Sequence, residues 1–179
     1  MSDEARLAEE TLSRSGRPST ALARVQRYLG DPVATETFRA TAARLKERAA
    51  MLVARDGLPA AGRACLQSGE ACLEAGESQK AVRIARDLLP QVRALAPDEQ
   101  VRLGFLLART GDANGAQTVL STLADSPAKC ALSAVFDGVG LQEAANDLEA
   151  AICARGPEDA KPWADSVWWG VIGWMRGQG

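Results

Sequence analysis

Two stretches of the sequence, SGEACLEAGESQKAVRIARDL at residues 68–88 and LGFLLARTGDANGAQTVLSTL at residues 103–123, share a pattern of small and apolar residues. The second stretch follows the first at an offset of 35 residues. The matched pairs are Gly69 and Gly104, Cys72 and Leu107, Gly76 and Gly111, Ala81 and Ala116, and Leu88 and Leu123. This recurrence predicts a repeated pair of antiparallel helices joined by a short turn.

The glycines of the two stretches have different expected roles. Two antiparallel helices approach closely only where a side chain at the crossing is small, so Gly69 and Gly104 are expected at helix crossings. Gly76 and Gly111 follow the first helix of each copy, where a left-handed backbone ends a helix and glycine adopts it without strain. The pattern therefore predicts close helix packing as well as helix boundaries.

The residues before the repeats carry helix signals of a more general kind. A first helix is expected at residues 3–14, ended by Ser-Gly-Arg-Pro at 15–18, and a second at 19–29 with Ser19 as its N-cap. Gly-Asp-Pro at 30–32 breaks the chain before the longest expected helix, residues 33–55. The apolar stripe of that helix is formed by Phe38, Ala42, Leu45, Ala49 and Leu52.

Composition favours helices throughout. Apolar residues make up 46% of the chain but aromatic residues only 4%, so the core is expected to consist of Ala, Leu and Val. Strong helix formers are abundant, and runs of β-branched or aromatic residues are rare. At 179 residues, the chain is expected to form one all-α unit.

The second copy has the residue order Leu103-Gly104, Leu107, Gly111-Asp112, Ala116, Leu120 and Leu123, with Pro127 after it. The first copy has Ser68-Gly69, Cys72, Gly76-Glu77, Ala81, Ala85 and Leu88, and a shorter third has Leu132-Ser133, Phe136, Gly140, Ala145, Ile152 and Pro157. This order resembles the tetratricopeptide repeat, a helical hairpin with a period of about 34 residues. The Trp and Tyr that the family places in its first helix are absent.

The resemblance implies an α-α superhelix of nine or ten helices. Residues 60–157 would form the repeats, residues 1–59 would pack on them, and residues 158–179 would form a Trp-rich terminal helix. The first helices of such repeats line a groove, here through Arg63, Leu66, Glu70, Leu73, Asp98, Val101, Phe105 and Arg109. A stripe of mixed apolar and charged residues suits an amphipathic helix or an extended peptide. The alternative is a face that is solvated or covered by the N-terminal helices.

All four tryptophans lie in the last seventeen residues, at Trp163, Trp168, Trp169 and Trp174. The apolar run from Val167 to Met175 is shorter than the roughly 20 residues that a bilayer-spanning helix needs. Burial of tryptophan is strongly favourable, so this segment is expected either to pack on the last repeat or to form a second interface. Contact with a membrane surface is the remaining alternative.

Several classes of function are disfavoured by what the chain contains. It has no histidine, which removes the commonest general base and many metal sites. A net charge of -2 with interspersed signs disfavours nucleic acid as a partner. Asp98 and Glu99 follow Pro97 and are expected to stabilise the first turn of a helix, not to form a catalytic pair. No catalytic, cofactor-binding or metal-binding residue is predicted.

The N-terminal residues lack the features of a secretory signal, so a cytoplasmic location without a transmembrane segment is expected. The four cysteines, Cys65, Cys72, Cys130 and Cys153, lack the spacing of a zinc site and are expected to be reduced and buried.

These observations predict a non-enzymatic module that binds a protein or peptide, such as an adaptor or chaperone. Small tetratricopeptide-like proteins include the cytosolic chaperones of bacterial type III secretion, so the resemblance implies such a chaperone as one instance. The alternative is a structural subunit that forms a homo-oligomer or a larger complex through its Trp-rich terminus.

Overall fold

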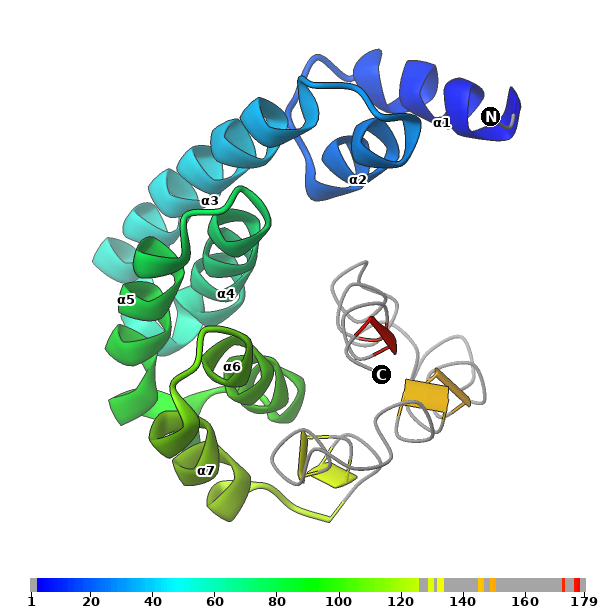
Figure 1. The fold of residues 1–179 in the computed structure, drawn as a ribbon. Coiled ribbons are helices and arrows are strands. Elements are labelled where there is room, and N and C mark those ends of the chain that lie inside the picture. The colour runs from blue at the N-terminus through cyan, green and yellow to red at the C-terminus, as the bar shows by residue number, and fades with distance from the viewer. Residues whose placement is uncertain are drawn as a thin grey trace.

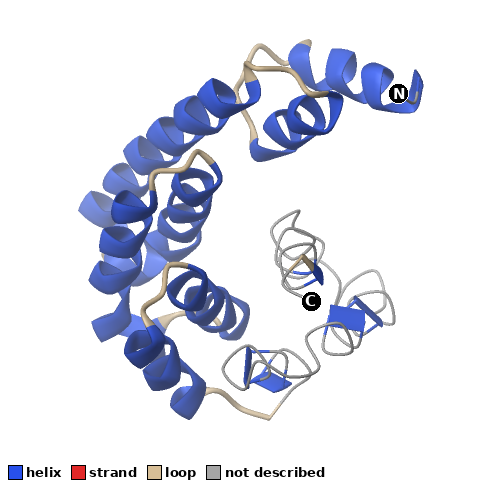
Figure 2. Cartoon of the chain, viewed as in Figure 1, coloured by secondary structure: helices blue, strands red, loops and turns tan. Residues whose placement is uncertain are grey.

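The structure, a computed structural model, describes residues 3–125 and, beyond them, 129–130, 132–133, 145–146, 149–150, 172 and 176–177. The helices within residues 3–125 are α1 (Asp3–Ser13), α2 (Thr20–Leu29), α3 (Ala34–Asp56), α4 (Leu58–Glu74), α5 (Ser78–Leu88), the 3₁₀ helix η1 (Leu89–Ala94), α6 (Pro97–Arg109) and α7 (Ala113–Thr122). The described residues contain no strand (Figure 2). The prediction of an all-α chain is therefore confirmed for this part of the molecule.

The helices are arranged as a crescent of antiparallel pairs (Figure 1). The helices α2, α4 and α6 form an inner layer, and α3, α5 and α7 form an outer layer. Within each pair, α2 packs on α3, α4 on α5, and α6 on α7. The pairs are joined by α3 packing along α4 and by contacts of α6 with both α4 and α5. Helix α1 lies at one tip of the crescent and packs on α2.

Each of the three pairs is closed by the same turn, a glycine followed by an acidic residue. The glycines Gly30, Gly76 and Gly111 have φ values of 75°, 80° and 81°. The N–H of the acidic residue then donates to a carbonyl five residues back, at N···O distances of 2.9 Å (Asp31 to Gln26), 2.8 Å (Glu77 to Cys72) and 2.9 Å (Asp112 to Leu107). This is the hydrogen-bond pattern by which a left-handed glycine ends a helix.

The predicted turns at Gly76 and Gly111 are thus confirmed. Gly-Asp-Pro at residues 30–32 predicts only a break in the chain, but the structure shows that α2 and α3 form a hairpin of the same kind as the two predicted ones.

The glycines within α4 and α6 lie at crossings, as predicted. A Cβ atom on Gly69 would lie 2.8 Å from Cδ2 of Leu106 and 3.4 Å from Cγ2 of Ile84. A Cβ atom on Gly104 would lie 2.5 Å from Cδ2 of Leu132 and 3.3 Å from Cγ1 of Val119. Each glycine therefore touches the second helix of its own pair and an apolar side chain further along the chain. No larger residue fits without displacing a neighbour.

In the second and third turns, the acidic residue also pairs with an arginine on the outer helix of the preceding helix pair. Nε of Arg86 on α5 donates to Oδ2 of Asp112 at 2.7 Å, and Nε of Arg39 on α3 lies 3.6 Å from Oε1 of Glu77. The hydrogen bond from Arg86, together with one from the Gly115 N–H, holds the pKa of Asp112 below its ordinary value. These contacts link successive hairpins at the ends of their helices.

Most local predictions for residues 3–125 hold. Ser19 caps α2, since its hydroxyl oxygen accepts from the N–H of Leu22 at 3.1 Å, and Pro97 and the two acids after it form the first turn of α6. The stripe of α3 is buried, apart from the half-buried Leu52. The 3₁₀ helix η1 was not predicted, and α4 begins at Leu58, so the boundary expected between residues 59 and 60 falls inside a helix.

The predictions for the terminal part of the chain lie mostly outside the described residues. They include the third repeat beyond its few described residues and the Trp-rich helix at 158–179. The expected total of nine or ten helices therefore stays a prediction.

Candidate functional site

The eight predicted groove residues lie on α4 and α6, in the inner layer. Five of them are buried: Leu66, Glu70, Asp98, Val101 and Phe105. Leu73 and Arg109 are half-buried, and Arg63 is exposed. The cause is that α4 and α6 are neighbours in the inner layer, so the two stripes contact each other and the core. In this structure the five buried side chains are not accessible to a partner.

Charged residues of α4 form ion pairs with charged residues of α6. Nη2 of Arg63 lies 2.9 Å from Oδ2 of Asp98, and Nη2 of Arg109 lies 2.7 Å from Oε1 of Glu74. In both pairs the partners are 35 residues apart, which is the repeat offset. Opposite charges at that offset were a usable sequence signal for an interface between repeats.

The most deeply buried ion pair joins Arg102 of α6 to Glu70 of α4. Arg102 donates from Nε to Oε1 at 3.2 Å and from Nη2 to Oε2 at 2.9 Å, a two-pronged contact. Its side chain is 0% exposed, and that of Glu70 is 7% exposed. The sequence does not single out Arg102, because an arginine on a helix is usually at the surface. This pair is 32 residues apart and so departs from the repeat offset.

Glu74 connects three helices of the inner layer. Its carboxylate accepts from Nη1 of Arg27 on α2 at 2.6 Å as well as from Arg109 on α6. Burial opposes the charged form of Glu74, but the hydrogen bonds from Arg109 and Arg27 and the positive charges of Arg109 and Arg24 outweigh it and lower the pKa of this carboxyl. The inner layer is therefore held together by charges that satisfy one another.

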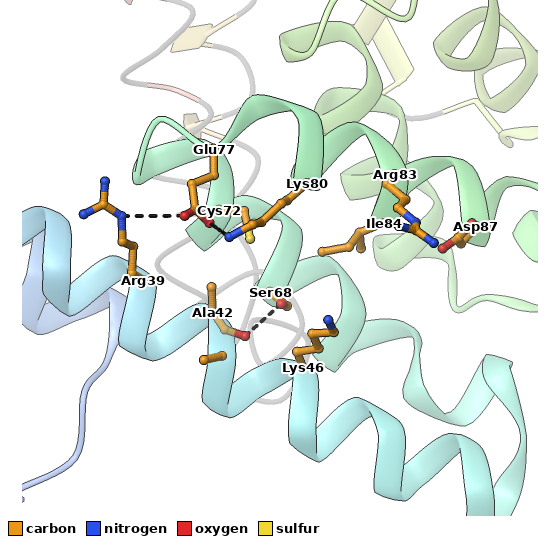
Figure 3. Close-up of a pocket in the computed structure, with 11 residues that line it drawn as sticks. Arg39, Ala42, Lys46, Ser68, Cys72, Glu77, Lys80, Arg83, Ile84 and Asp87 are labelled. Carbon is orange, nitrogen blue, oxygen red and sulfur yellow. Dashed lines mark hydrogen bonds and ion pairs between the residues drawn. The ribbon is translucent and has the colours of Figure 1, made fainter.

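The outer layer contains a groove of about 720 Å³ between α3 and α5, with α4 as its floor (Figure 3). We call it the outer groove. It is lined by Arg39, Ala42, Ala43 and Lys46 of α3, Ser68 and Cys72 of α4, Glu77 before α5, and Lys80, Arg83, Ile84 and Asp87 of α5. It exists because α3 and α5 both pack on α4 but make little direct contact with each other. Its volume is within the range of ligand pockets.

The outer groove is cationic at both ends and apolar in its middle. At one end Glu77 is shared by Arg39 and by Lys80, whose Nζ lies 2.9 Å from Oε2 of Glu77 (Figure 3). Lys46, Arg83 and Asp87 lie toward the other end. Four cationic side chains against two carboxylates leave a net charge of +2 in a chain whose net charge is -2. The lining therefore favours an anionic ligand.

The floor of the groove offers no reactive group at neutral pH. The hydroxyl of Ser68 donates to the carbonyl oxygen of Ala42 at 2.9 Å. Burial, followed by the charge of Glu77, raises the pKa of the Cys72 thiol. For Cys65, a residue of α4 outside the groove lining, burial followed by the charges of Asp87 and Glu99 raises the thiol pKa in the same way. Both thiols are thus held in the protonated form, which is a poor nucleophile and a poor metal ligand.

The predicted burial of the cysteines is correct for Cys72, and Cys65 is half-buried, but the prediction is wrong for Cys130, which is exposed. The three are free thiols, and Cys153 lies outside the described residues. Among the residues that the structure describes, no cluster of three or more His, Cys, Asp or Glu side chains is placed to hold a metal ion.

Comparison with protein-family models, with curated proteins and with solved structures finds no match to this chain. Function must therefore be argued from the arrangement of its residues. Within the described residues, none of the helices has the length and apolar character needed to cross a bilayer. The predicted second interface at the four tryptophans lies outside the described residues and stays a prediction, as does the structural-subunit alternative built on it.

Proposed function

We propose that this chain is a non-enzymatic protein-binding module built from tetratricopeptide-like helical hairpins, and that it acts as an adaptor or chaperone holding a partner polypeptide. The observation that carries the proposal is the recurrence of one hairpin three times, each closed by a glycine and an acidic residue. Stacked hairpins of this kind present a long surface, which suits a polypeptide better than a small metabolite.

The inner layer supports the proposal by making the stack rigid. The pairs Glu70 with Arg102 and Glu74 with Arg109 join α4 to α6, and Arg27 extends the connection to α2. A surface that is already ordered loses less conformational entropy when a partner binds. Arg63 and the walls of the outer groove are among the described side chains that a partner can reach.

Phe105 was expected to line the groove, but it is buried in the core, so its replacement is expected to lower stability. With 1% of its surface exposed, Phe105 is part of the core, so Phe105→Ala is expected to lower the free energy of unfolding by about 3–5 kcal/mol. Arg63→Ala removes an exposed partner of the buried Asp98 carboxylate and is expected to lower that free energy less, by about 1–2 kcal/mol. Urea denaturation of the two variants measures the difference.

The proposal is tested by affinity purification of the full chain from its native host, followed by mass spectrometry and by titration of each purified candidate against the purified chain. The expected result is a polypeptide that binds directly and saturably to the folded chain. Retrieval of no polypeptide that binds the purified chain directly would overturn the proposal. A chemical reaction of a small-molecule substrate with the purified chain would overturn it as well.

A further inference from the structure

Helix α1 presents an acidic face with a leucine at its centre. Its half-buried apolar residues Ala5, Ala8 and Leu12 lie on the face that packs on α2. The opposite stripe contains Asp3, Leu7 and Glu10, which are all exposed. Leu7 is 63% exposed, and no residue of α1 is fully buried. A leucine flanked by two carboxylates on a solvent face has no role in the packing of α1 on α2.

The outer groove has the complementary order of groups. Arg39 and Lys46 of α3 are seven residues apart, as are Asp3 and Glu10 of α1. Seven residues of helix span about 10 Å, so the two stripes match in length. Ala42 and Ala43 lie between the two cations on α3, and Ile84 faces them from α5. Helix α1 therefore has the order acid, apolar, acid, and the groove has cations at both ends with apolar residues between them. Arg39 already pairs with Glu36 and Glu77, so docking of α1 exchanges these partly exposed contacts for one with a carboxylate of α1.

The net charges of α1 and the groove are opposite in sign and similar in size. Residues Asp3–Ser13 carry four carboxylates and Arg6, a net charge of -3, against the net charge of +2 in the outer groove. The carboxylate of Glu10 pairs with Arg14 one turn later, but both side chains are more than half exposed, at 63% and 71%. Such a surface pair adds little stability and is easily exchanged for another cation.

We propose that α1 of one copy of this chain docks in the outer groove of a second copy. Leu7 lies over Ala42, Ala43 and Ile84, and Asp3 and Glu10 lie at the two cationic ends. Because each copy carries both a helix and a groove, the contact is heterologous and extends head to tail into larger assemblies. This self-association goes beyond the adaptor function proposed above, which concerns a different polypeptide. Since the walls of the outer groove are also offered to that polypeptide, the two contacts compete for the groove, and light scattering of the purified chain alone tests the self-association separately.

The contact is tested on the full chain by light scattering after size exclusion over a range of concentrations. Two variants each remove one half of the contact: a helix variant, Leu7→Asp with Glu10→Gln, and a groove variant, Lys46→Glu with Arg83→Glu. All four positions are exposed, so both variants are expected to keep the helicity and urea midpoint of the wild type. Wild-type chain is expected to gain mass with concentration, and each variant to associate at least about tenfold more weakly.

The decisive arm mixes the two variants. The groove variant keeps an intact α1 and the helix variant keeps an intact groove, so the mixture is expected to form one-to-one dimers and nothing larger. The matched control is Met51→Asp. Met51 is an apolar residue of α3 that lies outside the groove lining, and its exposure of 67% is close to that of Leu7, 63%. That variant is expected to associate as the wild type does.

Salt gives an independent reading, since contacts between exposed charges are screened as ionic strength rises. Association is expected to weaken with added sodium chloride. The proposal is overturned by a wild-type chain that stays monomeric, by association that both variants retain, by a mixture that forms no dimer, or by association that strengthens with salt.

Discussion

The inner and outer layers use the same kinds of charged residue in opposite ways. In the inner layer, Arg102 and Arg109 are covered, and each is paired with a carboxylate of α4. In the outer layer, Lys46 and Arg83 are exposed on the walls of a groove. A cation on a helix is therefore structural where the neighbouring hairpin presents a carboxylate to it. It remains accessible to a ligand where the neighbouring helix stands apart.

The difference originates in helix spacing. In the inner layer, Gly69 of α4 lets the side chain of Leu106 on α6 approach closely, so the two helices meet and their charges are enclosed. In the outer layer, α3 and α5 are each held by α4 but not by each other, which leaves the groove open. Four changes test this contrast, from the largest expected effect to the smallest.

Removal of the most buried cation should cost the most stability. Arg102→Ala leaves the Glu70 carboxylate buried without its two-pronged partner, and the free energy of unfolding is expected to fall by about 3–5 kcal/mol. The measurement is the urea denaturation midpoint followed by circular dichroism. The matched control is Arg83→Ala in the outer groove, expected to change stability by at most about 0.5 kcal/mol. Equal losses in the two variants would contradict the contrast between the layers.

Filling the crossing at Gly104 should have the next largest effect. The Cβ of Gly104→Val would lie 2.5 Å from Cδ2 of Leu132, which is too close, and 3.3 Å from Cγ1 of Val119, which is tight, so a loss of about 1–3 kcal/mol is expected. Thermal unfolding of the variant measures it. Ala50→Val, at an exposed position of α3, introduces the same side chain and should cost only its lower helix propensity, about 0.5 kcal/mol. A Gly104→Val variant as stable as Ala50→Val would show that the crossing is loose.

The inner network should make stability depend on pH. Because the pKa of Glu74 is lowered in the folded chain, its contribution is fully present at neutral pH, above the pKa of an unfolded glutamate. That contribution is lost as the pH falls through the lowered folded value. Urea midpoints measured from neutral to acid pH are expected to fall less steeply for Glu74→Gln than for the wild type. Parallel curves would show that Glu74 contributes nothing to acid sensitivity.

Charge reversal in the outer groove should have the smallest effect on folding. Lys46→Glu alone changes an exposed side chain, so the expected change in the free energy of unfolding is within about 0.5 kcal/mol. Urea denaturation at neutral pH is the measurement. A large loss would mean that Lys46 stabilises the packing of α3 and α5 and does not simply line the groove.

The sequence predicted those features that depend on one helix or one turn. Gly76 and Gly111 marked turns, Ser19 marked a cap, and Phe38 with its neighbours marked the buried face of α3. It did not predict that the inward stripes of α4 and α6 are buried. The stripe of α6 that contains Val101 and Phe105 would have the same spacing on the wall of a groove and in a core. The charges at Arg63 and Asp98 carried that information, since they match at the repeat offset.

The first hairpin was missed for a different reason. The turn glycines Gly76 and Gly111 are 35 residues apart, but Gly30 and Gly76 are 46 apart. The longer interval holds α3 and α4, of 23 and 17 residues, where the shorter one holds α5, η1 and α6, of 11, 6 and 13 residues. A search at one fixed offset cannot detect a repeat whose second helix has been lengthened. The geometry of its turn, in contrast, is the same as that of the other two.

The turns also bear on how the chain reaches its native state. Each closes through hydrogen bonds between residues no more than five positions apart, as from Glu77 to Cys72, so the entropy lost in forming it is small. Helices that pair with their immediate successors give a low contact order, which in small domains accompanies folding in microseconds to milliseconds. We expect the hairpins to form early as local units and the ion pairs between α4 and α6 to lock only when two of them meet. The slow step would then be the burial of Arg102 against Glu70, where both charges must lose their water together.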